Sequence, residues 1–366
     1  MFRPGVHTAA RMAAAALVPG LLVAGCKIQN LAAGDGQHRA RHTAPAHAKS
    51  RHHHSGHASK HSAKPGPVRL VTEPGAGFSP VYRLISGARH RIDMTMYELE
   101  DTTAEHRLAA AERRGVRVQV VLDQRERSTN SAAYHYLTAH KVAVTWSSSR
   151  FEYTHQKTLL IDQSAAVIMT ANLTSKYYAT SRDFLVIDRT PADISAIARV
   201  FSADFAHRGI KPGDGRDLVW SPTDSQRQLL ALIAGARHSL RIYSEEMGDS
   251  TVVDALIAAA RRGVDVRVCG ENTDGEYDDD FARLARAGVH VSYFSSPSGF
   301  YIHGKIVEAD YGTARARMFA GSENFSSTSL NRNRELGLIL RKHSAMASVA
   351  RTFAADFRRG KHWSSP

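Results

Sequence analysis

One pattern occurs twice in this chain and constrains its fold more than any other feature. A histidine is followed by a lysine two positions later and by an aspartate five positions after that. The copies are His155, Lys157 and Asp162, and then, 148 residues later, His303, Lys305 and Asp310. An asparagine follows each copy, Asn172 and Asn324. Because residues i and i+2 of an extended strand face the same side, the pattern predicts a strand that presents each histidine and lysine together.

The repetition extends well beyond the motif. Residues 85–90 and 113–118 match residues 233–238 and 261–266 at the same spacing, and after the second motif the spacing grows by four, as Asp183 and Glu335 show. An insertion near residues 311–317 accounts for the change. A fixed internal period identifies a duplicated unit. We therefore predict two halves, residues 68–212 and 218–366, joined by the glycine-rich segment 209–215.

The residue pattern of each half predicts alternating strands and helices. In the first half we expect strands over residues 91–97, 116–122, 142–146, 167–170 and 184–187, and helices over residues 103–114, 131–140 and 192–206. Alternation of this kind predicts a layered α/β fold. The roughly 300 residues that form the halves suffice for two modest domains or one large one.

The motif resembles that of the phospholipase D superfamily, HxKxxxxD followed by GSxN. The segment Gly321–Ser322–Glu323–Asn324 fits it, whereas Met169–Thr170–Ala171–Asn172 keeps a hydroxyl and the asparagine but lacks the glycine. The resemblance covers residues 68–360. It implies a duplicated α/β fold, with two mixed sheets flanked by helices and packed about a pseudo-twofold axis. Such packing would bring both His-Lys-Asn sets into one site.

These residue types suit the cleavage of a phosphodiester. Lys157, Lys305, Asn172 and Asn324 can donate hydrogen bonds to the phosphoryl oxygens as charge develops. One neutral imidazole can attack phosphorus to give a phosphohistidine, while the other protonates the leaving alkoxide and later deprotonates water. We expect neither a metal ion nor another cofactor. The resemblance implies that His155 attacks and His303 acts as the acid; the residues alone leave the order open.

Supporting roles also follow from the resemblance. It implies that acidic residues downstream of each motif, Asp183 and Glu335, hydrogen-bond the imidazoles and fix their tautomers. Ser322 belongs to the second GSxN segment. Asp162 and Asp310 lie at the far end of the predicted motif strand, so we expect them to be structural.

The first 67 residues differ from the rest in composition. Residues 1–25 read as an export signal, with Arg3 and Arg11 before an apolar run that is too short to span a bilayer. The small residues before Cys26 resemble a bacterial lipobox. That implies cleavage before Cys26 and a lipid anchor on the outer face of the cell membrane; the alternative is an ordinary cleaved signal and a secreted protein.

Residues 26–67 form a tail rich in His, Ala and Lys, which we expect to be disordered. Its composition indicates a cationic spacer or, alternatively, a metal-binding tract. Residues 1–67 supply +8 of the formal net charge of +13, leaving only +5 for the folded part. This weakens an inference of nucleic-acid binding from charge. Cys269 then stands alone, and we expect it in a buried strand.

The substrate is the least constrained feature. Aromatic residues beside the motifs, such as Tyr153 and Tyr301, suit either a lipid or stacked bases, and Arg182, Arg332 and Arg334 could hold a phosphate. We expect a monomer that hydrolyses or transfers phospholipid headgroup esters at a membrane surface. A metal-independent endonuclease is the main alternative. An inactive phosphate-binding module is disfavoured because neither motif has lost its histidine or lysine.

Overall fold

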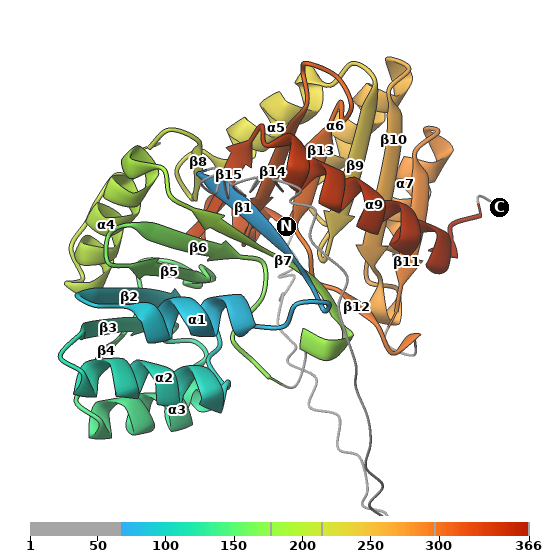
Figure 1. The fold of residues 1–366 in the computed structure, drawn as a ribbon. Coiled ribbons are helices and arrows are strands. Elements are labelled where there is room, and N and C mark those ends of the chain that lie inside the picture. The colour runs from blue at the N-terminus through green and yellow to red at the C-terminus, as the bar shows by residue number, and fades with distance from the viewer. Residues whose placement is uncertain (1–66, 176–177, 214, 296–297, 365–366) are drawn as a thin grey trace, which may run out of the picture. The chain divides into compact units, whose positions relative to one another are not determined.

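The computed structural model describes residues 67–175, 178–213, 215–295 and 298–364. The predicted signal segment, nearly all of the tail and Cys26 lie outside these residues. The described chain forms two eight-stranded mixed sheets flanked by helices (Figure 1). The predicted duplicated α/β fold is therefore confirmed.

The first sheet has the strand order β1-β7-β6-β5-β2-β3-β4, with a further strand, β12, added on β7. Its elements in chain order are β1 (Val68–Glu73), α1 (Ser79–Gly87), β2 (Arg91–Met96), α2 (Thr102–Arg113), β3 (Arg117–Leu122), α3 (Arg127–Ala139), β4 (Ala143–Trp146), β5 (Thr158–Ile161), β6 (Ala165–Met169), β7 (Ser181–Asp188) and α4 (Pro191–Phe205). The pairs β2–β3 and β3–β4 are parallel, and the other neighbouring strands from β1 to β2 are antiparallel.

The second half repeats this plan with the order β16-β11-β10-β9-β13-β14-β15-β8. Its elements are β8 (Leu218–Ser221), α5 (Ser225–Gly235), β9 (Ser239–Ser244), α6 (Ser250–Arg261), β10 (Asp265–Glu271), α7 (Asp278–Arg286), β11 (His290–Phe294), β12 (Tyr301–Ile302), β13 (Ile306–Ala309), β14 (Arg317–Gly321), α8 (Ser327–Asn331), β15 (Glu335–Leu340), α9 (His343–Arg359) and β16 (Lys361–His362). Residues 310–316 connect β13 to β14, where residues 162–164 suffice in the first half, so the insertion lies where the sequence predicts it.

Equivalent helices begin and end for the same reasons in both halves. Asp101 caps α2 by accepting a hydrogen bond from the backbone N–H of Ala104, and Asp249 caps α6 in the same way. A side-chain acceptor at this position satisfies one of the free N–H groups of the first turn. Both helices are followed by a glycine with positive φ, Gly115 at 86° and Gly263 at 85°. The local sequence thus sets both ends of the repeated helix.

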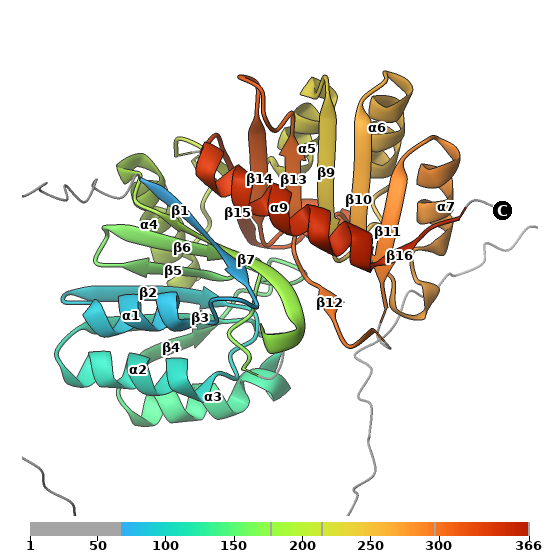
Figure 2. The same ribbon diagram turned by 45° about the vertical axis from the view of Figure 1, so that its right-hand side comes forward.

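Alternation along the strands divides the apolar side chains between two layers. Ile92, Met94 and Met96 of β2 pack with α1, α2 and α3 in one core. Residues on the opposite face, including Leu160 and Ile168, pack with α4 in a second core. That second core also contains side chains from β9, β14, β15 and α9 of the other half. The two halves, which lie side by side in Figure 2, consequently share this second core.

Buried ion pairs join the halves in a reciprocal manner. Arg182 of β7 pairs with Asp356 of α9, with Nε and Oδ2 2.6 Å apart. Arg334 pairs with Asp204 of α4, with Nε and Oδ2 3.0 Å apart. In the repeat, Arg182 corresponds to Arg334 and Asp204 corresponds to Asp356. The two ion pairs are therefore equivalent, and each joins the arginine of one half to the aspartate of the other. The expectation that Arg182 and Arg334 hold a substrate phosphate is wrong, because both guanidinium groups are engaged between the halves.

Two further comparisons with the sequence concern local structure. Cys269 lies buried in β10, as predicted. The histidine and lysine of each motif do not lie within a strand; they occupy the extended segment just before β5 and before β13. Within the part of the chain that the structure describes, no helix combines the length and apolar character needed to cross a membrane.

Candidate active site

The two motif segments place their lysines inside the protein and their histidines at its edge. Lys157 and Lys305 are both fully buried. Each ammonium donates a hydrogen bond to the carbonyl oxygen of the histidine two residues earlier, at 2.8 Å for Lys157 and 2.7 Å for Lys305. The same bond in both halves fixes the lysine beside its own histidine. The imidazoles retain a 13% exposed side chain, which leaves them accessible from solvent.

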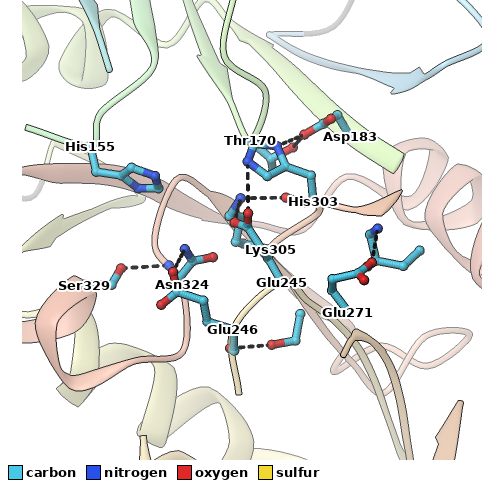
Figure 3. Close-up of polar contacts among 12 residues, drawn as sticks. His155, Thr170, Asp183, Glu245, Glu246, Glu271, His303, Lys305, Asn324 and Ser329 are labelled. Carbon is cyan, nitrogen blue, oxygen red and sulfur yellow. Dashed lines mark hydrogen bonds and ion pairs between the residues drawn. The ribbon is translucent and has the colours of Figure 1, made fainter. Parts of the chain in front are cut away.

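Each histidine is held by a carboxylate from the other half of the chain. Nδ1 of His155 lies 2.9 Å from Oε2 of Glu335. Nδ1 of His303 lies 2.7 Å from Oδ1 of Asp183, the pair that Figure 3 shows. A carboxylate at Nδ1 places a proton on that nitrogen and leaves Nε2 as the reacting atom. The structure therefore brings His155 and His303 into one shared site, which neither half can complete alone.

The two carboxylates are themselves held in place. Oε1 of Glu335 accepts hydrogen bonds from Ser329 Oγ at 2.6 Å and from Asn333 Nδ2 at 2.9 Å. Asp183 accepts from the hydroxyls of Thr170 and Ser181. Burial by itself would raise the pKa of Asp183, but His303 and Lys305 outweigh it and lower that pKa to about 2. Asp183 is therefore a charged carboxylate at neutral pH and accepts the hydrogen bond from His303 in that form.

The positive groups of the site lack the solvation they would have in water. Burial lowers the pKa of the His155 imidazole, and the nearby Lys157 ammonium lowers it further against the pull of Glu335. Burial and the charge of Lys305 together lower the pKa of Lys157 to about 7. The positive charges of Lys157 and Lys305 repel each other, and an anion bound near both would relieve that repulsion. Neutral imidazole at His155 is the form that can act as a nucleophile.

The two asparagines are oriented by glutamates that sequence reasoning missed. Nδ2 of Asn172 donates to Glu98 at 2.9 Å. In the second half, Nδ2 of Asn324 donates to Glu246 at 2.8 Å (Figure 3). Burial, followed by the charge of Glu245, raises the pKa of Glu246 to about 7. Glu98 and Glu246 stand 148 residues apart. The internal comparison could have found them, because they share the spacing of the two histidines.

The residues just before these glutamates break the symmetry of the site. In the first half, the ring of Tyr97 lies 4.5 Å from the His155 ring, centroid to centroid, and 4.8 Å from Lys157 Nζ. The second half has Glu245 at the equivalent place. Its Oε2 lies 2.5 Å from Lys305 Nζ, and its Oε1 lies 3.5 Å from Nε2 of His303 (Figure 3). The two motifs are alike, but their surroundings are not.

The remaining predicted site residues hold the backbone and do not reach the imidazoles. Asp162 accepts hydrogen bonds from the backbone N–H groups of residues 89–91, and Asp310 from those of residues 237–239. These bonds tie the end of the motif strand to the start of β2 or β9. Ser322 accepts from the backbone N–H of Leu336, at 3.2 Å. All three positions therefore stabilise the framework on which the site is built.

The site combines two imidazoles, two ammonium groups and two amides around one point, a set that suits a tetrahedral phosphoryl group. Such a group needs donors for its oxygens, a nucleophile and an acid. Among residues 67–364, apart from the gaps at 176–177, 214 and 296–297, no group of three or more His, Cys, Asp or Glu side chains is placed to hold a metal ion.

Comparison with known proteins places the chain in a family. A family model described as cardiolipin synthase, PLD-like domain, matches residues 81–206 and 229–357, one match in each half. The search of curated proteins found no match.

Solved structures show the same fold at low identity. The polyphosphate kinase of Porphyromonas gingivalis is 15% identical, with a TM-score of 0.65 over 80% of this chain and 47% of its own, so this chain spans about half the length of that enzyme. The phosphatidylserine synthase of Haemophilus influenzae Rd KW20 is 12% identical, with a TM-score of 0.63 over 81% of this chain and 87% of its own. At these identities, the likeness establishes the fold.

Proposed function

Because the chain belongs to the family of cardiolipin synthase, PLD-like domains, we propose that it is a phosphodiesterase of the phospholipase D type with one active site formed by both halves. The observation that carries this proposal is the exchange of carboxylates between the halves, His155 with Glu335 and His303 with Asp183. Two independent sites would have no use for such an exchange.

The proposed reaction proceeds in two displacements. Nε2 of His155 attacks phosphorus, the bond to the leaving oxygen breaks, and Nε2–H of His303 protonates that oxygen. Water then gives a proton to His303 and attacks phosphorus, and the P–N bond breaks to restore His155. An alcohol in place of water gives transfer instead of hydrolysis. The lowered pKa of His155 supports its role as nucleophile, because attack needs the neutral imidazole.

The fixed donors around the reacting phosphoryl group account for the rest of the mechanism. Lys157 and Lys305 are held by the carbonyl groups of their own histidines, and Asn172 and Asn324 by their glutamates. Because these groups are already in place, charge that develops on the phosphoryl oxygens requires little reorganisation. The same groups would bind any phosphodiester, so they do not select a substrate.

A phospholipid is the substrate class that we propose. The family model and one structural neighbour carry names of phospholipid-synthesising proteins, cardiolipin synthase and phosphatidylserine synthase. The proposed lipid anchor at Cys26 would hold the site at a membrane surface. Tyr301, with 38% of its surface exposed, lies next to the motif, and an exposed aromatic suits the interface of a bilayer.

The test is a side-by-side assay of the purified protein on phosphatidylcholine vesicles and on plasmid DNA, each with excess chelator. We expect release of choline and no nicking. Nicking without lipid turnover would favour the endonuclease. Neither activity in a folded protein would favour a phosphate-binding module. Loss of turnover on chelation, restored by a divalent ion, would contradict a mechanism based on two imidazoles.

A further inference from the structure

The repeat assigns equivalent positions to Tyr97 and Glu245. Each is the first residue after a central strand, β2 or β9, and they stand 148 residues apart, the spacing of the two histidines. The next residues, Glu98 and Glu246, are identical and perform the same task for the asparagines. Tyr97 and Glu245 directly precede this identical pair and contact the histidine and lysine of their own half-sites, so their difference points to a difference in what the two half-sites do.

Glu245 is held firmly in the second half-site. Its Oε2 lies 2.5 Å from Lys305 Nζ, and its Oε1 accepts a hydrogen bond from the Tyr301 hydroxyl at 2.9 Å while lying 3.5 Å from His303 Nε2. Its side chain is only 16% exposed. Both oxygens are therefore committed, and one of them lies beside the nitrogen that Asp183 leaves free. In the first half, Tyr97 presents an aromatic ring to His155 and Lys157.

The two imidazoles consequently differ in their electrostatic surroundings. A carboxylate lies near each nitrogen of His303, Asp183 at Nδ1 and Glu245 at Nε2. Burial alone would raise the pKa of Glu245, but His303 and then Lys305 hold it well below the usual range, so it stays charged. His155 has a carboxylate at Nδ1 only. The titratable groups around His303 come from several elements: Asp183 of β7, Glu245 after β9, Glu98 after β2, Tyr301 and Lys305 of its own segment, and His155 of the other motif.

We infer that Glu245 is the positioning residue that makes His303 the acid of the pair. Its Oε1 lies beside Nε2, the nitrogen whose hydrogen is given to the leaving oxygen, and its Oε2 holds Lys305 next to that nitrogen. The inference rests on the proposed phosphodiesterase function. It gives this chain a fixed order, with His155 as nucleophile and His303 as acid, through a contact that has no counterpart in the first half. Glu245 acts through His303 and Lys305 and need not touch the substrate.

The test compares two leaving groups on the same phosphatidyl group. Short-chain phosphatidylcholine expels an alkoxide and needs an acid, whereas phosphatidyl 4-nitrophenol expels a stable phenolate and needs none. We expect Glu245→Gln to reduce kcat/KM about 10- to 100-fold for the choline ester and by less than about threefold for the nitrophenyl ester.

Two further variants separate this effect from general damage. Glu245→Asp keeps the charge and should restore most of the choline-ester activity. Glu308→Gln removes another buried carboxylate, paired with Arg241 at 2.9 Å, outside the site. It should leave the ratio of the two activities unchanged.

Equal losses on both substrates in Glu245→Gln would overturn the inference while leaving the proposed function intact. A folded wild-type protein that cleaves neither ester would overturn the proposed function, and the inference with it.

Discussion

Replacing Glu335 by glutamine tests how the site controls the proton on His155. The carboxylate uses its two oxygens differently. Oε1 accepts from Ser329 and Asn333, and Oε2 faces Nδ1 of His155 at 2.9 Å. In a glutamine, the carbonyl oxygen must take the place of Oε1, because two donors already point there. The NH2 group is then directed at His155 and turns Nδ1 into an acceptor.

The expected loss follows from the tautomer that this amide selects. With Nδ1 accepting, the imidazole proton moves to Nε2, and the lone pair that should attack phosphorus is no longer available. A comparable acid-to-amide change beside the histidine of a serine protease triad lowers kcat about 10,000-fold. A loss of similar size here corresponds to about 5 kcal/mol of transition-state stabilisation. The phosphohistidine should not form even with phosphatidyl 4-nitrophenol, because attack itself is blocked.

The assay is a single-turnover measurement of phosphate trapped on histidine, alongside steady-state rates on both esters. Glu308→Gln serves as the control for loss of a buried carboxylate, and thermal unfolding shows whether each variant remains folded. A Glu335→Gln variant that keeps more than about a tenth of wild-type activity would refute the tautomer reasoning. Trapped label on His303 in that variant would show that the histidines exchange roles.

Three other predictions follow from the same structure. His155→Ala and His303→Ala should each abolish nearly all turnover of the choline ester, with the double variant hardly worse, because groups that act as one unit lose function together; half the activity in each single variant would indicate two separate sites. Cys26→Ala should move the protein from the membrane fraction to the soluble fraction, and a variant that stays bound would contradict the proposed anchor. Arg334→Leu should lower the free energy of unfolding by about 3–5 kcal/mol by leaving Asp204 as a buried unpaired charge, and adding Asp204→Leu should recover most of that loss; an unchanged denaturation midpoint in the single variant would show that the pair does not stabilise the fold.

The sequence predicts best those parts of the structure that occur in both halves. Local signals mark the strands and helices of each half, and the common spacing of His155 and His303 identifies the duplication. From there, the superfamily resemblance leads to a shared α/β architecture, which the structure and the family model confirm. Elements with weak patterns, such as β12 with its two residues, gave no usable signal.

Contacts between the halves could not be predicted from local patterns. Asp183 and Glu335 were expected near the imidazoles, but nothing in the sequence states that each serves the histidine of the opposite half. Arg182 and Arg334 show the same difficulty, since a conspicuous arginine near a motif resembles a phosphate ligand until its buried partner is known. Glu245 was missed because the repeat has a tyrosine, Tyr97, at the equivalent position. Its role becomes visible only from its contacts with His303 and Lys305.

The hydrogen bonds from each histidine to the carboxylate of the other half also determine at which stage of synthesis and folding the site can form. They connect residues 120 and 180 positions apart. Contacts this distant in sequence close large loops, and in general they form slowly. Glu335 follows His155 by 180 positions, so a chain that is still being synthesised and has not reached Glu335 has no partner for the His155 ring. Until that contact forms, the chain lacks the oriented imidazole that the proposed phosphodiesterase reaction requires.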